Sequence, residues 1–183
     1  MSNNISLKIK DEKLKGLQKI QEVLEKYSKS YIKVGLFGGN HPLSGESLPS
    51  IGALHEFGLK GSRTFTYKGE KIKISGLPAR SWLRLPLKIK RVQLKGKGYE
   101  GKEFFKRVIV SELKNGYTGV ALKFLGRNAT NIIDEAFNTQ GFGNWEPNIN
   151  KRYVELKGSN IPLIDTGALR NAVTYKIAEG GQQ

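Results

Sequence analysis

Apolar residues recur along this chain at two spacings: three or four residues apart in some segments, and two apart in others. The first spacing is typical of one face of an α-helix, and the second of a β-strand. Helices are predicted over 11–28, 50–57, 104–113, 118–139 and, more briefly, 152–157. Strands are predicted over 5–9, 31–37 and 172–178. The pattern therefore predicts an α+β fold, in which a small mixed or antiparallel sheet packs with an N-terminal helix and a central helical pair.

Turn-forming residues divide these elements. Residues 64–75 alternate on both sides of Lys68-Gly69-Glu70 and predict a β-hairpin, which opens an extended basic hairpin and loop region over 64–97. Three glycines within 96–101 predict an internal linker. The glycine- and glutamine-rich end predicts a flexible tail over 178–183. A length of 183 residues fits one domain spanning 1–183.

The segment from Pro162 to Val173 (PLIDTGALRNAV) carries the signature of a helix start. Either Asp165 or Thr166 is expected to cap the free N–H groups of a short helix. Leu169 and Val173 are four residues apart and are expected to share one face of that helix.

The charge of the chain is strongly unbalanced, with 31 Lys and Arg against 16 Asp and Glu, a formal net charge of +15. Such an excess favours an anionic partner, although it also serves solubility. Basic residues are densest over 80–97. If the partner is nucleic acid, attraction to its phosphates is independent of base sequence.

Several classes of chemistry lack the residues they need. The chain has no cysteine, which excludes disulfides and thiolate sites, and its two histidines do not form a zinc motif because Leu59 stands where a second histidine would be required. The glycines at 35–39 match no phosphate-binding loop, and no nucleophile elbow occurs. We therefore expect neither an enzyme nor a bound metal or cofactor.

Membrane and export signals are also missing from the sequence. No apolar run approaches the ~20 residues of a membrane span, and the first residues have no apolar signal-peptide core. We expect a protein that is made and used in an aqueous cytoplasm.

The segment Leu77–Arg84 (LPARSWLR) combines a tryptophan with two arginines. Trp and Arg are favoured anchors of protein interfaces, so Arg80, Trp82 and Arg84 are candidate contacts with a partner. The alternative is that Trp82 fills the core while the two arginines are solvated. His55 and Glu56, near the end of a predicted helix, are candidate polar contacts across a subunit boundary.

Five blocks occur in a fixed order: VGLFGG at 34–39, IGALHEFG at 51–58, LPARSWLR at 77–84, WEP at 145–147, and PLIDTGALRNAV at 162–173. With this set the chain resembles the virion-morphogenesis and tail-completion proteins of long-tailed bacteriophages, including the Mu-type proteins. The resemblance covers about 31–173. The chain departs from the family in ending ten residues after Val173 and in its expanded region from 64 to 97.

The resemblance implies a structural protein of the phage neck that joins head to tail, built as a ring, often hexameric, around the DNA channel. Implied partners are further copies of the chain, neighbouring head-completion or connector proteins, tail-terminator or tail-tube proteins, and double-stranded DNA. The implied location is the virion, after assembly in the host cytoplasm. Arg80, Trp82, Arg84, His55 and Glu56 become candidate ring contacts. Candidate DNA-channel residues are Lys88, Lys90, Arg91, Lys95 and Lys97. The alternative is a sequence-independent nucleic-acid-binding protein of a phage or prophage.

Overall fold

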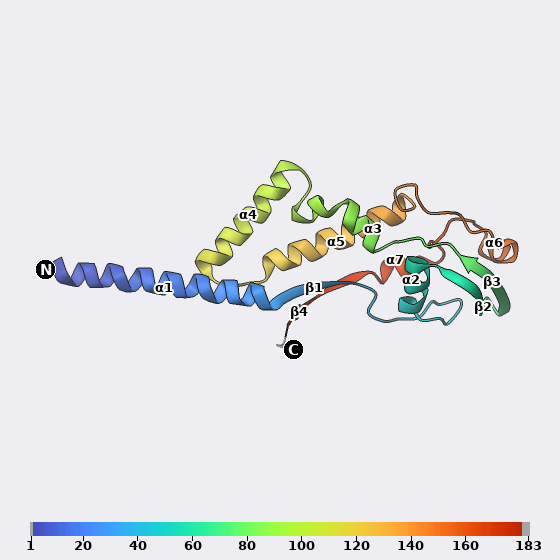
Figure 1. The fold of residues 1–183 in the computed structure, drawn as a ribbon, viewed down its shortest axis with the longest axis horizontal. Helices are drawn as coiled ribbons and strands as arrows, with labels where there is room; N and C mark the ends of the chain where they lie inside the picture. The colour runs from blue at the N-terminus through green and yellow to red at the C-terminus, as the bar shows by residue number, and fades with distance from the viewer. Residues whose placement is uncertain (1, 181–183) are drawn as a thin grey trace. The chain divides into compact units, whose positions relative to one another are not determined.

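A computed structural model describes the backbone of residues 2–180 and the side chains of residues 11–180 (Figure 1). The described part contains seven α-helices, one 3-10 helix and four strands, which confirms the α+β class. In chain order these are α1 (Ser2–Lys29), β1 (Ser30–Gly35), α2 (Leu48–Phe57), β2 (Leu59–Tyr67), β3 (Glu70–Leu77), α3 (Arg84–Ile89), η1 (Arg91–Lys95), α4 (Gly98–Asn115), α5 (Val120–Asn138), α6 (Lys151–Lys157), α7 (Ala168–Asn171) and β4 (Thr174–Glu179).

The described chain forms two compact units, each assembled from segments that are distant in sequence. Unit 1 contains residues 2–33, 92–128 and 176–180, and unit 2 contains residues 34–91 and 129–175. β1, β4 and α5 contribute residues to both units. The expectation of one domain over 1–183 stays a prediction.

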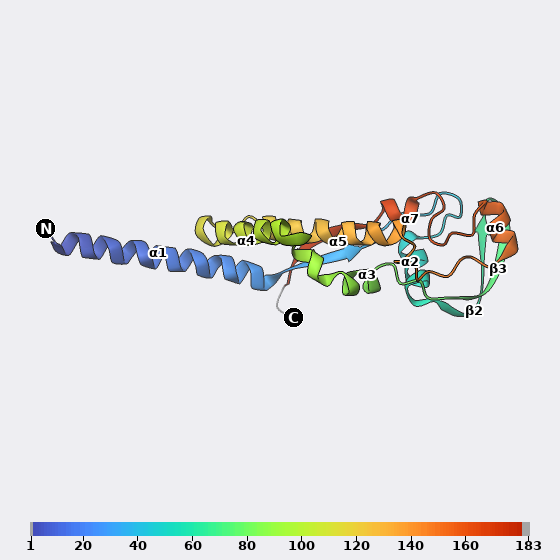
Figure 2. The same cartoon turned by 90° about the horizontal axis from the view of Figure 1, so that it is seen from above.

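Unit 1 is built on two helices, α1 and α4, which pack against each other. Val23 of α1 is fully buried, and the ring of Tyr27 meets that of Tyr117 edge to face. In both views of the fold, the N-terminal part of α1 extends past the end of α4 (Figures 1 and 2). The predicted helix over 11–28 is confirmed as part of α1.

The predicted strand over 5–9 is wrong, because these residues continue α1. The alternation that suggested a strand spans only three apolar residues. No glycine or proline separates it from the helix that follows, and extending an existing helix is far easier than nucleating one.

A buried carboxylate on α4 organises the start of α5. Glu112 accepts hydrogen bonds from the backbone N–H groups of Thr118 and Val120, at 3.2 and 2.9 Å, and from the hydroxyls of Tyr27 and Thr118. The first N–H groups of a helix have no partner within the helix, so an acceptor from another element satisfies them. Glu112 thereby joins α1, α4 and α5.

The glycines at 96–101, predicted as a linker, lie at the start of α4 instead: Gly96 precedes the helix, and Gly98 and Gly101 belong to its first turn. A Cβ atom placed on Gly96 would lie 2.4 Å from the carbonyl carbon of Gly101, so the two backbones touch. Gly96 and Gly101 are needed because the chain passes close to itself there, which no larger residue permits.

Two separate two-stranded antiparallel sheets replace the single sheet that was expected: β1 pairs with β4, and β2 with β3. The predicted hairpin is confirmed and is longer than 64–75, with Phe65 opposite Ile72 and Tyr67 opposite Glu70. β4 extends to Glu179, so the first two residues of the expected tail belong to a strand. Residues 181–183 lie outside the described part of the chain.

The core of unit 2 surrounds the second half of α5. Phe137 is fully buried between two tryptophan rings, 6.2 Å from that of Trp82 and 5.5 Å from that of Trp145, measured between ring centroids. Leu48 and Leu169 complete the buried cluster together with Ile133 and Ala136. This core supports the walls of the site described below.

Replacing Glu112 with Gln should lower the free energy of unfolding by about 2 kcal/mol, because an amide cannot accept all the hydrogen bonds that this carboxylate accepts. Denaturant unfolding measures the loss. Glu103→Gln is the matched control on the same helix, since the partner of Glu103 among the described residues is the exposed Lys106. Equal stability of the two variants would contradict the role given to Glu112.

Candidate functional site

Glu56, at the end of α2, binds the whole turn that leads into α3. Its carboxylate, only 4% exposed, accepts backbone N–H bonds from Trp82 and Leu83 at 2.9 Å, and from Arg84 at 3.2 Å. The Ser81 hydroxyl and the Arg84 guanidinium donate to it as well, at 2.7 and 2.8 Å. Burial alone would raise the pKa of Glu56, but these donors hold its pKa below the usual value.

Arg80 is a buried charge that clamps a distant segment onto this turn. It is 1% exposed, and its guanidinium donates to the carbonyls of Glu146 and Pro147 at 2.6 and 2.9 Å. The backbone N–H of Arg80 donates to the backbone carbonyl of His55 at 2.6 Å. Burial lowers the pKa of Arg80. The residue therefore ties the 145–147 block to α2.

Trp82 belongs to the core. It is 3% exposed, and its indole N–H donates to the carbonyl of Gly52 at 2.8 Å. A Cβ on Gly52 would lie 2.6 Å from a methyl of Leu36 and 3.0 Å from the indole ring, so only glycine fits there.

These positions correct the interface prediction for Arg80, Trp82 and Glu56, which are buried inside unit 2 and not on its surface. His55 is also largely buried. Of the five candidates, only Arg84 is exposed, and its guanidinium lies 4.5 Å above the ring of the exposed Phe57. The sequence alone could not separate an interface tryptophan from a core one, because both environments favour the same residue.

All five sequence blocks meet in this one core. Leu36, Trp82, Trp145 and Leu169, from four of the blocks, lie in the cluster around Phe137 or pack against it. The remaining block, at 51–58, supplies Gly52, whose carbonyl accepts the indole N–H of Trp82. The ordered set of blocks therefore describes how unit 2 is built.

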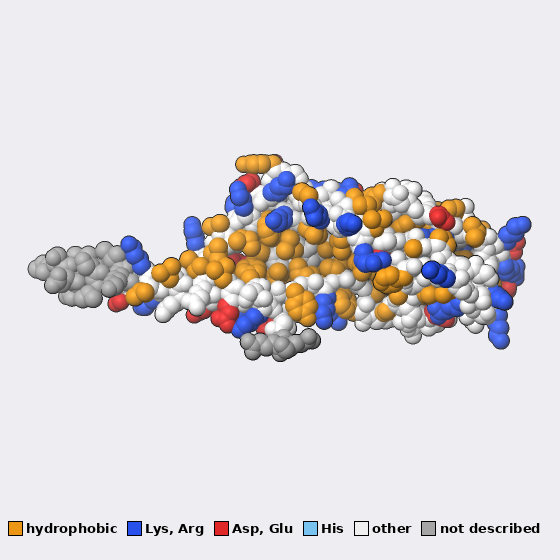
Figure 3. Space-filling model, in the orientation of Figure 1, with side chains coloured by type: hydrophobic (Ala, Val, Ile, Leu, Met, Phe, Trp, Pro, Cys, Tyr) orange, Lys and Arg blue, Asp and Glu red, His pale blue; other side chains and the backbone are white. Residues whose placement is uncertain are grey.

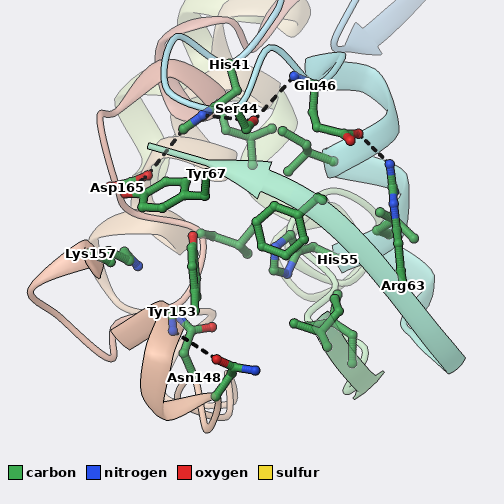
Figure 4. A pocket seen from close by; sticks show the side chains of 18 of the residues that line it. His41, Ser44, Glu46, His55, Arg63, Tyr67, Asn148, Tyr153, Lys157 and Asp165 are labelled. Carbon is green, nitrogen blue, oxygen red and sulfur yellow. Dashed lines mark hydrogen bonds and ion pairs between the residues drawn. The ribbon is translucent and has the colours of Figure 1, made fainter. Parts of the chain in front are cut away.

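Beside this core, unit 2 contains a cavity of about 380 Å³, closed on one side by the inner face of the β2–β3 hairpin. Figure 4 shows the imidazole of His41 between Ser44 and Asp165 in its wall. Nδ1 of His41 lies 3.3 Å from the Ser44 hydroxyl, and Nε2 lies 3.3 Å from a carboxylate oxygen of Asp165. Tyr67 donates its hydroxyl proton to the same carboxylate, with O–O distances of 3.0 and 2.9 Å.

This cluster corrects the prediction for Asp165 as a helix cap. Gly167 occupies the cap position of α7, and the nearby Thr166 hydroxyl accepts the N–H of Ala168 at 3.3 Å. Asp165 instead faces Tyr67 and His41. The cluster was missed because His41 and Asp165 are far apart in sequence, and no local motif links a loop histidine to a carboxylate beyond 120 residues.

Hydroxyl, imidazole and carboxylate in a row can relay a proton, as in acyl-transfer enzymes. Here the Ser44 hydroxyl also accepts the N–H of Glu46, at 3.3 Å, which is the bond of a serine that closes its own turn. No group of three or more His, Cys, Asp or Glu side chains within the described residues is arranged to hold a metal ion. The geometry is that of a polar corner in a largely apolar, aromatic cavity.

Burial shifts the pKa values of three groups in the cavity wall. Burial, with the nearby positive charges of Arg80 and Lys157, lowers the pKa of His55 to about 3. Burial raises the pKa of Tyr153 to about 12 and lowers that of Lys157. His55 is therefore neutral near pH 7.

The candidate DNA-channel residues divide between the units. Lys88, Lys90 and Arg91 belong to unit 2, and Lys95 and Lys97 belong to unit 1. All except Lys90 are exposed. Lys90 lies 3.7 Å from the Glu135 carboxylate and above the ring of Phe142. The channel role of the set stays a prediction.

No protein-family model, no curated protein and no solved structure matches the chain. Among the described helices, none is both long and apolar enough to cross a membrane.

Trp82→Ala should lower the free energy of unfolding by about 3–5 kcal/mol, because it leaves a hole in the core and removes the bond to Gly52. Phe57→Ala is the control, since Phe57 is the exposed aromatic of α2 and its loss should change little. Denaturant unfolding of both variants measures this. Wild-type stability of Trp82→Ala would mean that the tryptophan is not part of the core.

Acid should destabilise the fold through His55. The unfolded chain binds a proton at this side chain below about pH 6.5, whereas the folded chain resists protonation down to about pH 3. Stability from the neutral imidazole is therefore lost as the pH falls through this window. The stability difference between wild type and His55→Gln should shrink by about 2 kcal/mol between pH 7 and pH 5. Ala53→Gln, at an exposed position of the same helix, is the control, and its stability should depend on pH as that of wild type does. Parallel curves for wild type and His55→Gln would refute the prediction.

Proposed function

We propose that this chain is a structural virion protein of the neck of a long-tailed phage, a ring-forming subunit that completes the tail or joins it to the head. The observation that carries the proposal is an uncovered apolar surface on α1, which another protein chain would cover. The five sequence blocks that resemble the tail-completion proteins support it, and so does the net charge of +15.

The α1 apolar stripe consists of Leu14, Leu17, Ile20 and Leu24, spaced three or four residues apart. All four are exposed in the folded chain; Leu17 is 64% exposed and Leu24 is 56% exposed. Figure 3 shows hydrophobic side chains continuing along α1. Although α1 packs against α4 through Val23, these four side chains gain no burial there, and burial is worth roughly 25 cal/mol for each Å² of apolar area. The stripe therefore favours a partner.

A second copy of the chain is the occupant that we propose, because unit 1 carries a second apolar surface. Tyr99 and Val110 of α4 are exposed and lie about three helical turns apart, on one face of the helix. Glu112, which contacts Tyr27 of α1, lies on the opposite face of α4. Two different surfaces on one subunit are what a head-to-tail contact requires, and such contacts close into rings when the rotation allows.

The positive charge supports a position around DNA. A subunit next to a DNA channel would contact the phosphate groups of DNA and would not need to recognise its bases. A sequence-independent nucleic-acid-binding protein remains the second candidate, favoured by the same charge. The oligomeric state separates the two, because only the ring requires self-association.

We expect the purified chain to self-associate, and the double variant Leu17→Gln/Leu24→Gln to remain monomeric with an unchanged melting temperature. Light scattering and sedimentation give the mass, and circular dichroism gives the melting curve. Lys15→Gln/Lys26→Gln is the matched control on the polar positions of α1 and should associate like wild type.

Wild-type chain that stays monomeric both in solution and in purified phage particles would refute the ring. Particles assembled with the Leu17→Gln/Leu24→Gln chain should show tailless heads beside free tails. Normal particles that contain the variant would show that the apolar stripe of α1 is not needed for assembly.

A further inference from the structure

We propose that the outer face of the β2–β3 hairpin is a binding surface for the phosphate backbone of double-stranded nucleic acid. The hairpin outer face consists of the exposed residues Ser62, Thr64, Thr66, Lys71, Lys73 and Ser75, of which Lys73 and Ser75 also line the cavity. Lys60, beside the irregularity in strand pairing between Leu59 and Ser62, is exposed as well. The proposal deepens the proposed function, on which it rests, by assigning the surface that would meet DNA.

Strand alternation separates this face from the inner one. Tyr67 and Ile72 point inward and are buried, and Phe65 and Ile74 line the cavity. Since successive side chains of a strand point to opposite faces, the residues between them must point outward. The buried side chains of the inner face anchor the hairpin within unit 2. The outer face therefore belongs to an anchored hairpin.

The register places an ammonium group beside a hydroxyl in each of two cross-strand pairs. Thr64 is opposite Lys73, and Thr66 is opposite Lys71. Directly opposite side chains have Cβ atoms about 5 Å apart, and lysines two residues apart on a strand are about 7 Å apart. Lys, Ser and Thr are among the side chains that contact phosphate oxygens.

Within the described part of the chain, no carboxylate neutralises this face. Glu70 is the one acidic residue of β2 and β3, and both of its oxygens accept hydrogen bonds from Arg152 of α6, at 2.6–2.9 Å. Lys60, Lys71 and Lys73 form no ion pair with any residue that the structure describes. Figure 3 shows Lys and Arg side chains gathered where β2, β3 and α6 lie.

The chemistry of the face selects a duplex over other anionic partners. It has no aromatic residue on which an unpaired base could stack, as single-strand binding requires. It also has no apolar residue, whereas the centre of a protein interface is rich in them. A two-stranded ribbon has the width that a major groove admits. With no Asn, Gln or Arg on the face to read base edges, binding should not depend on sequence.

The test compares two variants with the same loss of charge, from +15 to +13. Lys71→Thr/Lys73→Thr removes the ammonium groups and keeps residues that favour strands. Lys114→Gln/Lys123→Gln is the control, with both lysines exposed on α4 and α5. Fluorescence anisotropy measures binding of two unrelated 20-base-pair duplexes at several salt concentrations.

Wild type and control should bind both duplexes alike, with a steep loss of affinity as salt rises. The slope of log affinity against log salt should become shallower by about 2 for Lys71→Thr/Lys73→Thr. Equal slopes for the two variants would overturn the proposal. So would preference for one duplex, tighter binding of a single strand, or equally effective competition by polyglutamate.

The mass of each sample, measured in the same buffers, keeps this proposal distinct from the ring. If the hairpin proposal alone is wrong, Lys71→Thr/Lys73→Thr binds DNA like the control while every chain still associates. If the ring alone is wrong, wild type is monomeric and the salt slopes still differ.

Discussion

The buried carboxylate of Glu56 is the interaction on which unit 2 depends. It is a charge in a poorly hydrated position, and such a charge is stable only when hydrogen bonds replace its lost water. Three successive backbone N–H groups, a hydroxyl and a guanidinium provide them. Because the donors come from residues 81–84, the carboxylate fixes where α3 begins. It also fixes how Trp82 enters the core.

Arg80 connects the same region to the 145–147 block. Its guanidinium reaches two carbonyls in the 145–147 block, which places Trp145 against Phe137. A buried anion and a buried cation thus hold three separate segments together, each satisfied chiefly by hydrogen bonds to other groups. The residues that make the sequence recognisable are therefore interior residues. The surfaces proposed for partners, on α1 and on the outer face of the hairpin, are made of residues outside the five blocks.

Local patterns were sufficient to predict most helices and the hairpin, because these depend on periodicity and turn chemistry within a short window. They failed where three-dimensional proximity decides the outcome. The glycines at 96–101 were taken for a linker because a close approach of two backbones looks the same in sequence as flexibility. Asp165 was taken, with Thr166, for one of two candidate caps because its partners, Tyr67 and His41, are about a hundred residues away in sequence. For Trp82 the sequence left an interface and the core open, and both alternatives kept Arg80 in contact with a partner or with solvent. The burial of Arg80 depends on carbonyl groups that no sequence motif identifies.

The interleaving of the two units has a consequence for synthesis. Unit 1 combines 2–33 with 92–128 and 176–180, and unit 2 combines 34–91 with 129–175, so neither can be completed from the first half of the chain. On the ribosome, α1 emerges long before α4, the helix that buries Val23. Contacts between such distant segments form late and slowly. The apolar residues of α1 are thus exposed until α4 has been synthesised. During that interval, premature pairing between nascent chains is a hazard.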